Sequence, residues 1–390
     1  MQRKTFRVAT LVMAMAAVTA FHAEAATIRV EQDGSGDFTE IAAGILAASP
    51  GDTIRIGPGW YQGSAPFTTG GSTEETFVAV DVDSLTIIGE DRDTVLIGPD
   101  VPNFTTQGPR GIVLLDGVVT FARLESMTIT NVGSAVFATS SFAAKEIAVV
   151  GCRRGFAFAF AVGIVLENVS TTNVDRAIIG GGAVSDVVVV GSEFRSCPNS
   201  GGVSFTTGVN GIVVEDSRFI DCAFQLSLGS TGNLRTSSFA GSESFVQLGD
   251  FSNLDMVGCT IEQALFNVVV NGESHVSGRD NVFLGGSVTT LLFTGSSTSS
   301  LTNNHIFRLD GSPVVLAEAY RVEPVQVDLR GNWWGTTNAD SLRAWIVDGD
   351  DLDNPPFFDE FAEVLFEPFA PGPVSGKAES IGSFKSRFRD

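Results

Sequence analysis

Short apolar segments return at a regular interval along most of this chain. Their anchor positions run from Ile129 to Trp333 in nine steps of roughly 23 residues. Within each repeat, apolar and polar residues alternate over four to six positions before a turn. This pattern predicts a solenoid of short stacked strands, in which each coil buries its apolar side chains against its neighbours. The segments lie at residues 127–129, 147–149, 168–170, 193–195, 218–220, 238–239, 260–261, 282–283, 305–306 and 333–334.

The competing all-β architecture is a β-sandwich, whose strands follow one another about every 8–12 residues. The longer repeat of this chain favours the solenoid. We therefore expect a parallel β-helix of about 11–12 coils. Its coils are expected to occupy residues 63–335.

The segment before the coils predicts an N-terminal cap and first coil, over residues 26–62. An amphipathic helix is expected at residues 37–49, with Asp37 as its N-cap and Glu40 completing a capping box. A solenoid needs such a cover because its end coil otherwise exposes apolar core and unpaired backbone groups.

The segment after the coils predicts a second cap, over residues 336–370. It contains a helical stretch at 341–347 and a short final apolar segment. The last residues, 371–390, are rich in Gly, Ser and charged residues, which is typical of a disordered tail.

The first 25 residues predict an export signal. Three cations within the first seven residues precede an apolar run at 11–21 and the small-x-small sequence Ala23-Glu24-Ala25. We expect cleavage near Ala25, and a mature protein that is secreted or periplasmic. No second apolar run of spanning length follows, so no membrane span is expected.

The charge of the chain argues against two classes of binding partner. The formal net charge is −21 at pH 7. Binding to nucleic acid or to anionic membranes rests on neutralising phosphates with Lys and Arg, so neither partner is expected.

The 43 Gly and 30 Phe residues suit a chain that turns often and stacks flat side chains inside a sheet. We expect a monomer.

In an exported chain, cysteines can form disulfides, so the positions of the four cysteines are informative. Cys197 and Cys222 occupy the same position on consecutive coils, which stack about 4.8 Å apart, a distance that a disulfide can bridge. The alternative is a stack of buried thiols, since Cys packs as a small apolar residue. Cys152 is two or more coils away and Cys259 is out of phase, so both are expected to be free and buried.

Motifs at the two ends carry a family resemblance. Residues 34–41, 51–56 and 58–61 resemble the N-terminal cap and first coil of pectin lyase-like proteins. The run Asn332-Trp333-Trp334-Gly335-Thr336-Thr337 resembles the closing motif of exported bacterial right-handed parallel β-helix repeat proteins. The resemblance covers nearly the whole mature chain and implies a right-handed winding. It does not imply one reaction, because the fold hosts lyases, esterases, hydrolases, epimerases and non-enzymatic surface proteins.

The catalytic motifs of these enzyme classes are missing. The sequence has no Asn-Thr-Asp motif of polygalacturonases, and its one Asp-Asp pair, Asp350-Asp351, falls in the predicted C-terminal cap. The Asp-Pro-His motif of alginate epimerases is also absent. Of the histidines after the export signal, His275 and His305, the second lies among Asn residues that are typical of a structural ladder at a coil corner.

The strongest polar group comprises Glu193, Arg195, Asp216 and Arg218 on consecutive coils. These are the candidate catalytic residues, with Arg195 or Arg218 as the base of a lyase and the acids as metal ligands. The alternative is a set of cross-strand ion pairs, which contribute little to stability.

Three arginines at nearby turns, Arg153, Arg154 and Arg176, are candidate ligand-binding residues. An arginine guanidinium holds a sugar carboxylate through two parallel hydrogen bonds. The surrounding negative charge would oppose a polyanionic sugar.

An acidic turn offers a separate candidate metal site. Asp348, Asp350, Asp351 and Asp353 could supply oxygen ligands for Ca²⁺, but their spacing does not match an EF-hand loop. A solvated turn is the alternative. We expect no other cofactor.

These observations predict a non-catalytic extracellular scaffold that binds a polysaccharide or a cell-surface glycan. The alternative is a pectin lyase-like, polysaccharide-acting enzyme, a lyase or a hydrolase.

Overall fold

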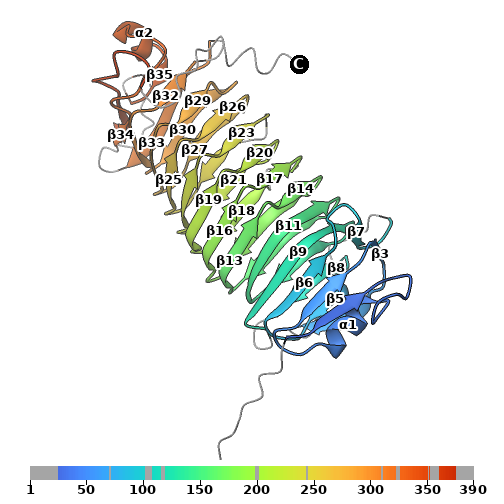
Figure 1. The fold of residues 1–390 in the computed structure, drawn as a ribbon. Helices are drawn as coiled ribbons and strands as arrows, with labels where there is room; N and C mark the ends of the chain where they lie inside the picture. Colours follow the sequence, from blue (N-terminus) through green and yellow to red (C-terminus); the bar gives the residue numbers. More distant parts are fainter. Residues whose placement is uncertain are drawn as a thin grey trace, which may run out of the picture.

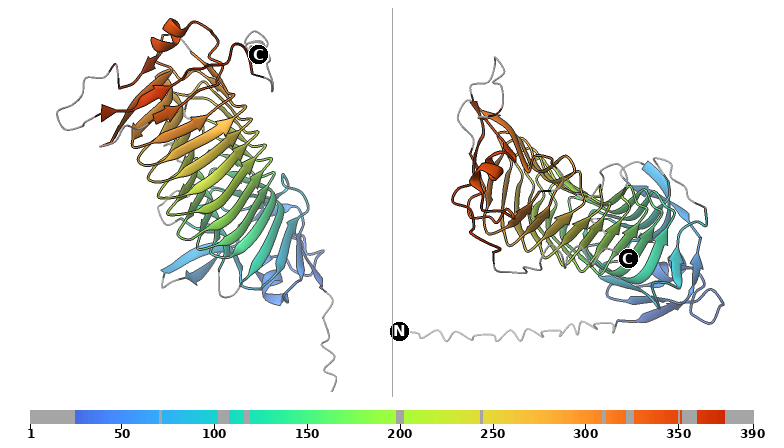
Figure 2. Two further views of the ribbon diagram at one scale, coloured as in Figure 1. Left: turned by 90° about the vertical axis from the view of Figure 1, so that its left-hand side faces the viewer. Right: turned by 90° about the horizontal axis from the view of Figure 1, so that it is seen from above.

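The computed structural model describes residues 25–69, 72–101, 108–115, 119–197, 202–242, 245–308, 311–321, 326–349, 351 and 360–374. The described chain is a parallel β-solenoid of about 12 turns, with few helical residues. Figure 1 shows the strands stacked along one axis, from the first coils in blue to the last in red. Figure 2 shows the same stack of coils from two further sides. The predicted fold class is confirmed at this level.

Each regular coil contributes three strands, one to each of three faces. The long-strand face comprises β1 (Thr27–Val30), β2 (Thr53–Ile56), β6 (Leu85–Gly89), β9 (Phe121–Thr130), β11 (Ser141–Val150), β13 (Val162–Glu167), β16 (Ser185–Val190), β19 (Asn210–Glu215), β22 (Thr231–Arg235), β25 (Asn253–Val257), β28 (His275–Arg279), β31 (Thr298–Leu301), β34 (Gln326–Asp328) and β37 (Glu363–Leu365).

The short-strand face follows it around each coil. It comprises β3 (Gly59–Tyr61), β7 (Val95–Ile97), β14 (Ser170–Thr172), β17 (Glu193–Arg195), β20 (Arg218–Ile220), β23 (Ser238–Ala240), β26 (Thr260–Glu262), β29 (Val282–Leu284) and β32 (His305–Phe307). The second halves of β9 and β11 pair in this row, so these two strands join both faces.

The return face closes each coil. It comprises β4 (Ala65–Thr69), β5 (Ser72–Val80), β8 (Arg110–Leu114), β10 (Ser134–Ala138), β12 (Arg154–Ala159), β15 (Arg176–Gly181), β18 (Val203–Thr206), β21 (Phe224–Leu226), β24 (Val246–Leu248), β27 (Phe266–Val270), β30 (Thr289–Gly295), β33 (Val315–Arg321) and β35 (Ile346–Val347). The strand β36 (Glu360–Phe361) pairs antiparallel with β33.

Residues at equivalent positions of successive coils stack on one another inside the solenoid. Phe194, Phe219 and Phe239 are aligned by the strand register and fully buried. The rings of Phe219 and Phe239 lie parallel with centroids 4.3 Å apart. Alternation of inward apolar and outward polar residues along each strand produces this column, because a parallel register places like residues side by side.

The corner between the long-strand and short-strand faces contains a buried polar ladder. The side-chain amides of Asn281, Asn304 and Asn332 are 0 % exposed and hydrogen-bond in series, with Nδ2 to Oδ1 distances of 2.9 Å at each step. The Oδ1 of Asn304 also accepts the backbone N–H of Asn281 at 3.0 Å. The predicted asparagine ladder is therefore present. It satisfies backbone groups at a corner where the chain leaves the sheet.

The N-terminal segment differs from its prediction in detail. The helix α1 (Ile41–Ala47) is shorter than expected, and its N-cap residue is Glu40, without a side-chain cap. The expected capping box is wrong, because the Asp37 carboxylate instead accepts the backbone N–H of Arg29 at 2.8 Å. Ile41 and Ile45 are buried.

The second helix, α2 (Ala339–Arg343), begins at Asn338, whose side chain accepts the N–H of Ser341. It starts and ends earlier than the predicted helical stretch at 341–347, with which it shares residues 341–343. Among the described residues, no helix has the length and apolar character needed to cross a membrane. The predicted export signal and most of the predicted tail, residues 375–390, lie outside the described residues.

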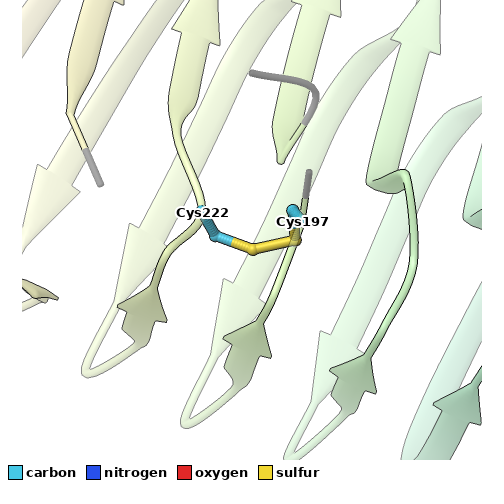
Figure 3. The surroundings of a disulfide bond; sticks show 2 residues. All are labelled: Cys197 and Cys222. Carbon is cyan, nitrogen blue, oxygen red and sulfur yellow. A yellow bond between two sulfur atoms is a disulfide. The ribbon is translucent and has the colours of Figure 1, made fainter. Parts of the chain in front are cut away.

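The structure joins Cys197 and Cys222, on consecutive coils, in a disulfide (Figure 3). Their Cα atoms are 4.9 Å apart, close to the spacing of neighbouring strands. Cys152 and Cys259 are free and buried, and burial raises the pKa of each thiol to about 12.

We predict that the denatured, unreduced protein titrates two thiols with a chromogenic disulfide reagent, and four after reduction. The native protein should react slowly, because the Cys152 and Cys259 thiols are buried and protonated. Four reactive thiols without reductant would show that Cys197 and Cys222 are not joined.

We predict that Asn304→Ala lowers the free energy of unfolding by about 1–3 kcal/mol, because buried partners on both sides lose their hydrogen bonds. Chemical denaturation measures the change. The control Thr302→Ala, at an exposed position two residues earlier, should change stability by less than about 0.5 kcal/mol. Equal effects of the two substitutions would contradict a stabilising ladder.

Candidate functional site

The structure brings together the residues of the predicted catalytic group, but it pairs them with one another. Glu193 on β17 forms an ion pair with Arg195, two residues along the same strand. The Nη2 of Arg195 also donates to Oε2 of Glu193 at 3.1 Å. Arg218 lies directly opposite Glu193 on β20, with Nη1 3.7 Å from Oε2. The Glu193 carboxylate therefore forms ion pairs with both arginines.

This pairing works against the role of Arg195 as a base. The hydrogen bond to Glu193 raises the pKa of Arg195, whereas a base must first lose its proton. The hydrogen bond from Arg195 lowers the pKa of Glu193. The Asp216 carboxylate lies apart from these three, at a corner with φ of 49°, and accepts the Thr236 hydroxyl at 2.6 Å. The geometry is that of surface ion pairs.

The three arginines predicted to bind a ligand lie close together at the start of the return face. Arg154 on β12 and Arg176 on β15 are register partners, and Arg153 precedes Arg154. The structure adds Arg110 on β8, which the sequence analysis missed, because Ser134 on β10 is the register partner of both Arg110 and Arg154. The arginine cluster is defined as Arg110, Arg153, Arg154 and Arg176.

The acidic turn is only partly described. Asp348 is 1 % exposed, and its Oδ2 accepts the backbone N–H of Val364 at 3.0 Å. The Nη1 of Arg343 lies 3.8 Å from the same oxygen. Asp350 and Asp353 lie outside the described residues, and Asp351 is described without its neighbours. Within the described ranges, no cluster of three or more acidic, His or Cys residues is placed to hold a metal ion.

A shallow hollow of about 210 Å³ lies on the long-strand face, where the sequence analysis placed no site. We call it the polar groove. Two columns of outward side chains line it, and each column steps across β22, β25 and β28 by register. Thr231, Asn253 and His275 form one column, and Asn233, Asp255 and Ser277 form the other.

The side chains of the polar groove form a hydrogen-bonded set. The Ser277 hydroxyl donates to Oδ1 of Asp255 at 3.0 Å, and Nη2 of Arg235 donates to Oδ1 of Asn233 at 3.2 Å. Arg235 also lies 3.8 Å from the Asp255 carboxylate. These contacts hold the side chains in place and leave several of their polar atoms directed to the surface.

His275 is the titratable base within this set. Its Nδ1 lies 2.8 Å from the hydroxyl of Thr298 on β31. Burial lowers the pKa of His275 below its ordinary value, so the ring is neutral at pH 7. The other histidine in the described part of the chain, His305, is 9 % exposed, and its Nε2 lies 3.1 Å from the backbone oxygen of Val374. His305 therefore contacts the chain itself, in agreement with the structural role expected for it.

Exposed apolar side chains stand at the corner that precedes the long-strand face. Phe251 precedes β25 and is 61 % exposed, and Leu228 precedes β22 and is 54 % exposed. Both have positive φ, 67° and 54°, which is rare for bulky residues. The backbone oxygen of Phe251 accepts the side-chain amide of Asn253, which lines the groove.

A simple signal could have located the polar groove. Its two columns repeat at intervals of 22 residues, at positions 231, 253 and 275 and at positions 233, 255 and 277. On the preceding strands β13, β16 and β19 the second column holds Val165, Val188 and Val213. The change from valine to Asn, Asp and Ser marks where the face becomes polar.

Comparison with known proteins finds only distant similarity. No family model matches the chain, and no curated protein matches it. Among solved structures, a GH136 lacto-N-biosidase from Eubacterium ramulus is 11% identical, with a TM-score of 0.33, over 79% of this chain and 67% of that chain. An alginate lyase from a Paenibacillus species is 10% identical, with a TM-score of 0.27, over 75% of this chain and 99% of that chain. Similarity at this distance assigns no activity to the chain.

We predict that Glu193→Gln lowers the free energy of unfolding at pH 7 by no more than about 1 kcal/mol, because the Glu193 and Arg195 side chains are partly open to solvent. The folded-state pKa of Glu193 lies below its ordinary value of 4.5, so its contribution is present above that pH. The difference between wild type and variant should therefore vanish as the pH falls and Glu193 is protonated. Denaturation across pH measures it, with Glu215→Gln as an exposed control; a pH-independent difference would contradict the pairing.

Proposed function

We propose that this protein is an exported glycan-binding scaffold that holds a polysaccharide chain along the polar groove. The observation that carries the proposal is the groove itself, in which Asn233, Asp255 and Ser277 present polar groups on three consecutive coils. Neighbouring strands lie about 4.8 Å apart, a spacing comparable to the length of one pyranose unit. Successive sugars could then meet successive sets of hydrogen-bonding groups.

The rim of the groove supports a carbohydrate ligand. Sugar rings have apolar faces as well as hydroxyl edges, and binding sites combine a few placed polar groups with aromatic or apolar surface. Phe251 and Leu228 supply exposed apolar surface at the adjoining corner. Asn and Asp side chains offer both acceptors and donors to hydroxyl groups.

The charge of the protein favours a neutral polysaccharide in this groove. The Asp255 carboxylate forms an ion pair with Arg235, and the whole chain has a net charge of −21. A polyanionic glycan would be repelled at long range. We infer that the ligand is a neutral glycan.

We also infer that the export signal is cleaved near Ala25. The mature protein is then a monomeric, right-handed β-helix whose helix α1 covers the first coil.

The alternative function is a polysaccharide-acting enzyme. It would draw on His275 and Asp255, because these titratable groups line the same groove. The paired Arg195 and Arg218 do not support it.

We predict that the protein without its first 25 residues binds a neutral polysaccharide from a panel of glucans, xylans and mannans without cleaving it. Asp255→Ala and Asn233→Ala should each weaken binding roughly tenfold, as expected for one or two lost hydrogen bonds. Affinity electrophoresis and calorimetry measure binding, and a reducing-sugar assay measures cleavage.

The matched control is Glu215→Gln. Glu215 is an exposed residue on β19 of the same face, and it does not line the groove. It should bind as the wild type does. New reducing ends that disappear in His275→Gln would establish the enzymatic alternative. Equal binding by all variants would place the glycan elsewhere.

A further inference from the structure

The arginine cluster is a concentration of positive charge in an acidic protein. Arg154 and Arg176 face each other on neighbouring strands, about 4.8 Å apart in the backbone. Arg110 lies two strands from Arg154, with the small Ser134 between them. The strand register therefore draws three guanidinium groups from separate coils to one edge of the return face.

This arrangement is electrostatically unfavourable in the protein alone. Like charges directly opposite each other on paired strands destabilise a sheet. Burial, followed by the neighbouring charges of Arg153, Arg176 and Arg110, lowers the pKa of Arg154. Glu74 offsets part of the charge through its ion pair with Nε of Arg110.

Arg110 is held in position but not fully satisfied. Its guanidinium carbon lies 4.1 Å from the centroid of the Phe137 ring, and Nε donates to Glu74. Its Nη1 is buried and has no acceptor among the described residues, and neither has the hydroxyl of Thr76, its register partner on β5. Buried donors without acceptors are costly, so they are rare in native structures.

We propose that Arg110, Arg154 and Arg176 form a binding site for an oxyanion group, a carboxylate, sulfate or phosphate. Such a group would offset the repulsion between Arg154 and Arg176 and the neighbouring charge of Arg110. The planar guanidinium group matches the paired oxygens of these anions. The phenyl ring of Phe137 fixes the plane in which Arg110 presents its donors.

This site is separate from the polar groove. The cluster lies on strands β8, β12 and β15 of the return face, whereas the groove lies on β22, β25 and β28 of the long-strand face. The inference does not rest on the proposed function, and a protein that binds no neutral glycan could still bind an oxyanion here.

The test measures binding of inorganic sulfate, inorganic phosphate and glucuronate to the mature chain by calorimetry at constant ionic strength. We expect saturable binding of one or more of them, and a thermal midpoint that rises with the concentration of the anion that binds. Arg176→Gln is the main variant, because Arg176 is exposed at a strand start and its loss should not prevent folding. It should weaken binding at least tenfold.

Arg279→Gln is the matched control, since Arg279 is an exposed arginine that pairs with Asp280 on the long-strand face. It should bind as the wild type does. Ser134→Asp provides a second test, because a carboxylate between Arg110 and Arg154 should occupy the site, raise the thermal midpoint and abolish the response to the anion. Equal responses in wild type, Arg176→Gln and Arg279→Gln would reflect a general salt effect on stability and would overturn the proposal. The three anions distinguish a sulfate or phosphate site from a uronate site.

Discussion

The structure depends on the parallel register between neighbouring coils. Each coil is too thin to bury its own apolar side chains, so every inward residue must match the residue one coil away. Phe219 meets this requirement by stacking on Phe239, and Asn304 meets it by hydrogen bonding to Asn281 and Asn332. A shift of the register by one residue would turn the apolar set outward and break both columns.

The same register has a second consequence at the outer surface. Outward positions are also aligned in columns, but packing places few demands on them. A column can therefore change character along the axis, as the long-strand face does between Val213 on β19 and Asn233 on β22. Binding surfaces of a solenoid arise in this way, from a row of equivalent positions that the core leaves free.

Charge is distributed unevenly over this framework. The Glu193 carboxylate pairs with both Arg195 and Arg218, so part of the positive charge of these two arginines is compensated within the protein. In the arginine cluster, Glu74 pairs with Arg110, while Arg154 and Arg176 stand opposite each other on neighbouring strands. In a chain of net charge −21, this is a local concentration of positive charge.

Much of the interior could be predicted from the sequence. The period of apolar residues identifies the solenoid, and the position of each cysteine within its repeat separates Cys197 and Cys222 from Cys259. Inward positions are predictable because they follow from the alternation along a single strand, which is a local property. The exception is α1, where Asp37 bonds to Arg29 rather than capping the helix, so a tertiary contact outweighed a local motif.

The surface sites were decided by the tertiary structure. Arg110 precedes Ser134 by 24 residues and Ser134 precedes Arg154 by 20, so unequal coils hide their alignment in the sequence. For Glu193 and Arg218 the sequence left a catalytic group and an ion pair as alternatives, and the contacts between coils decide for the ion pair. The sequence by itself determined the repeat and its buried stacks, because these need only local alternation. Only the folded chain decided which outward side chains share a face, because that depends on how the backbones of successive coils pair.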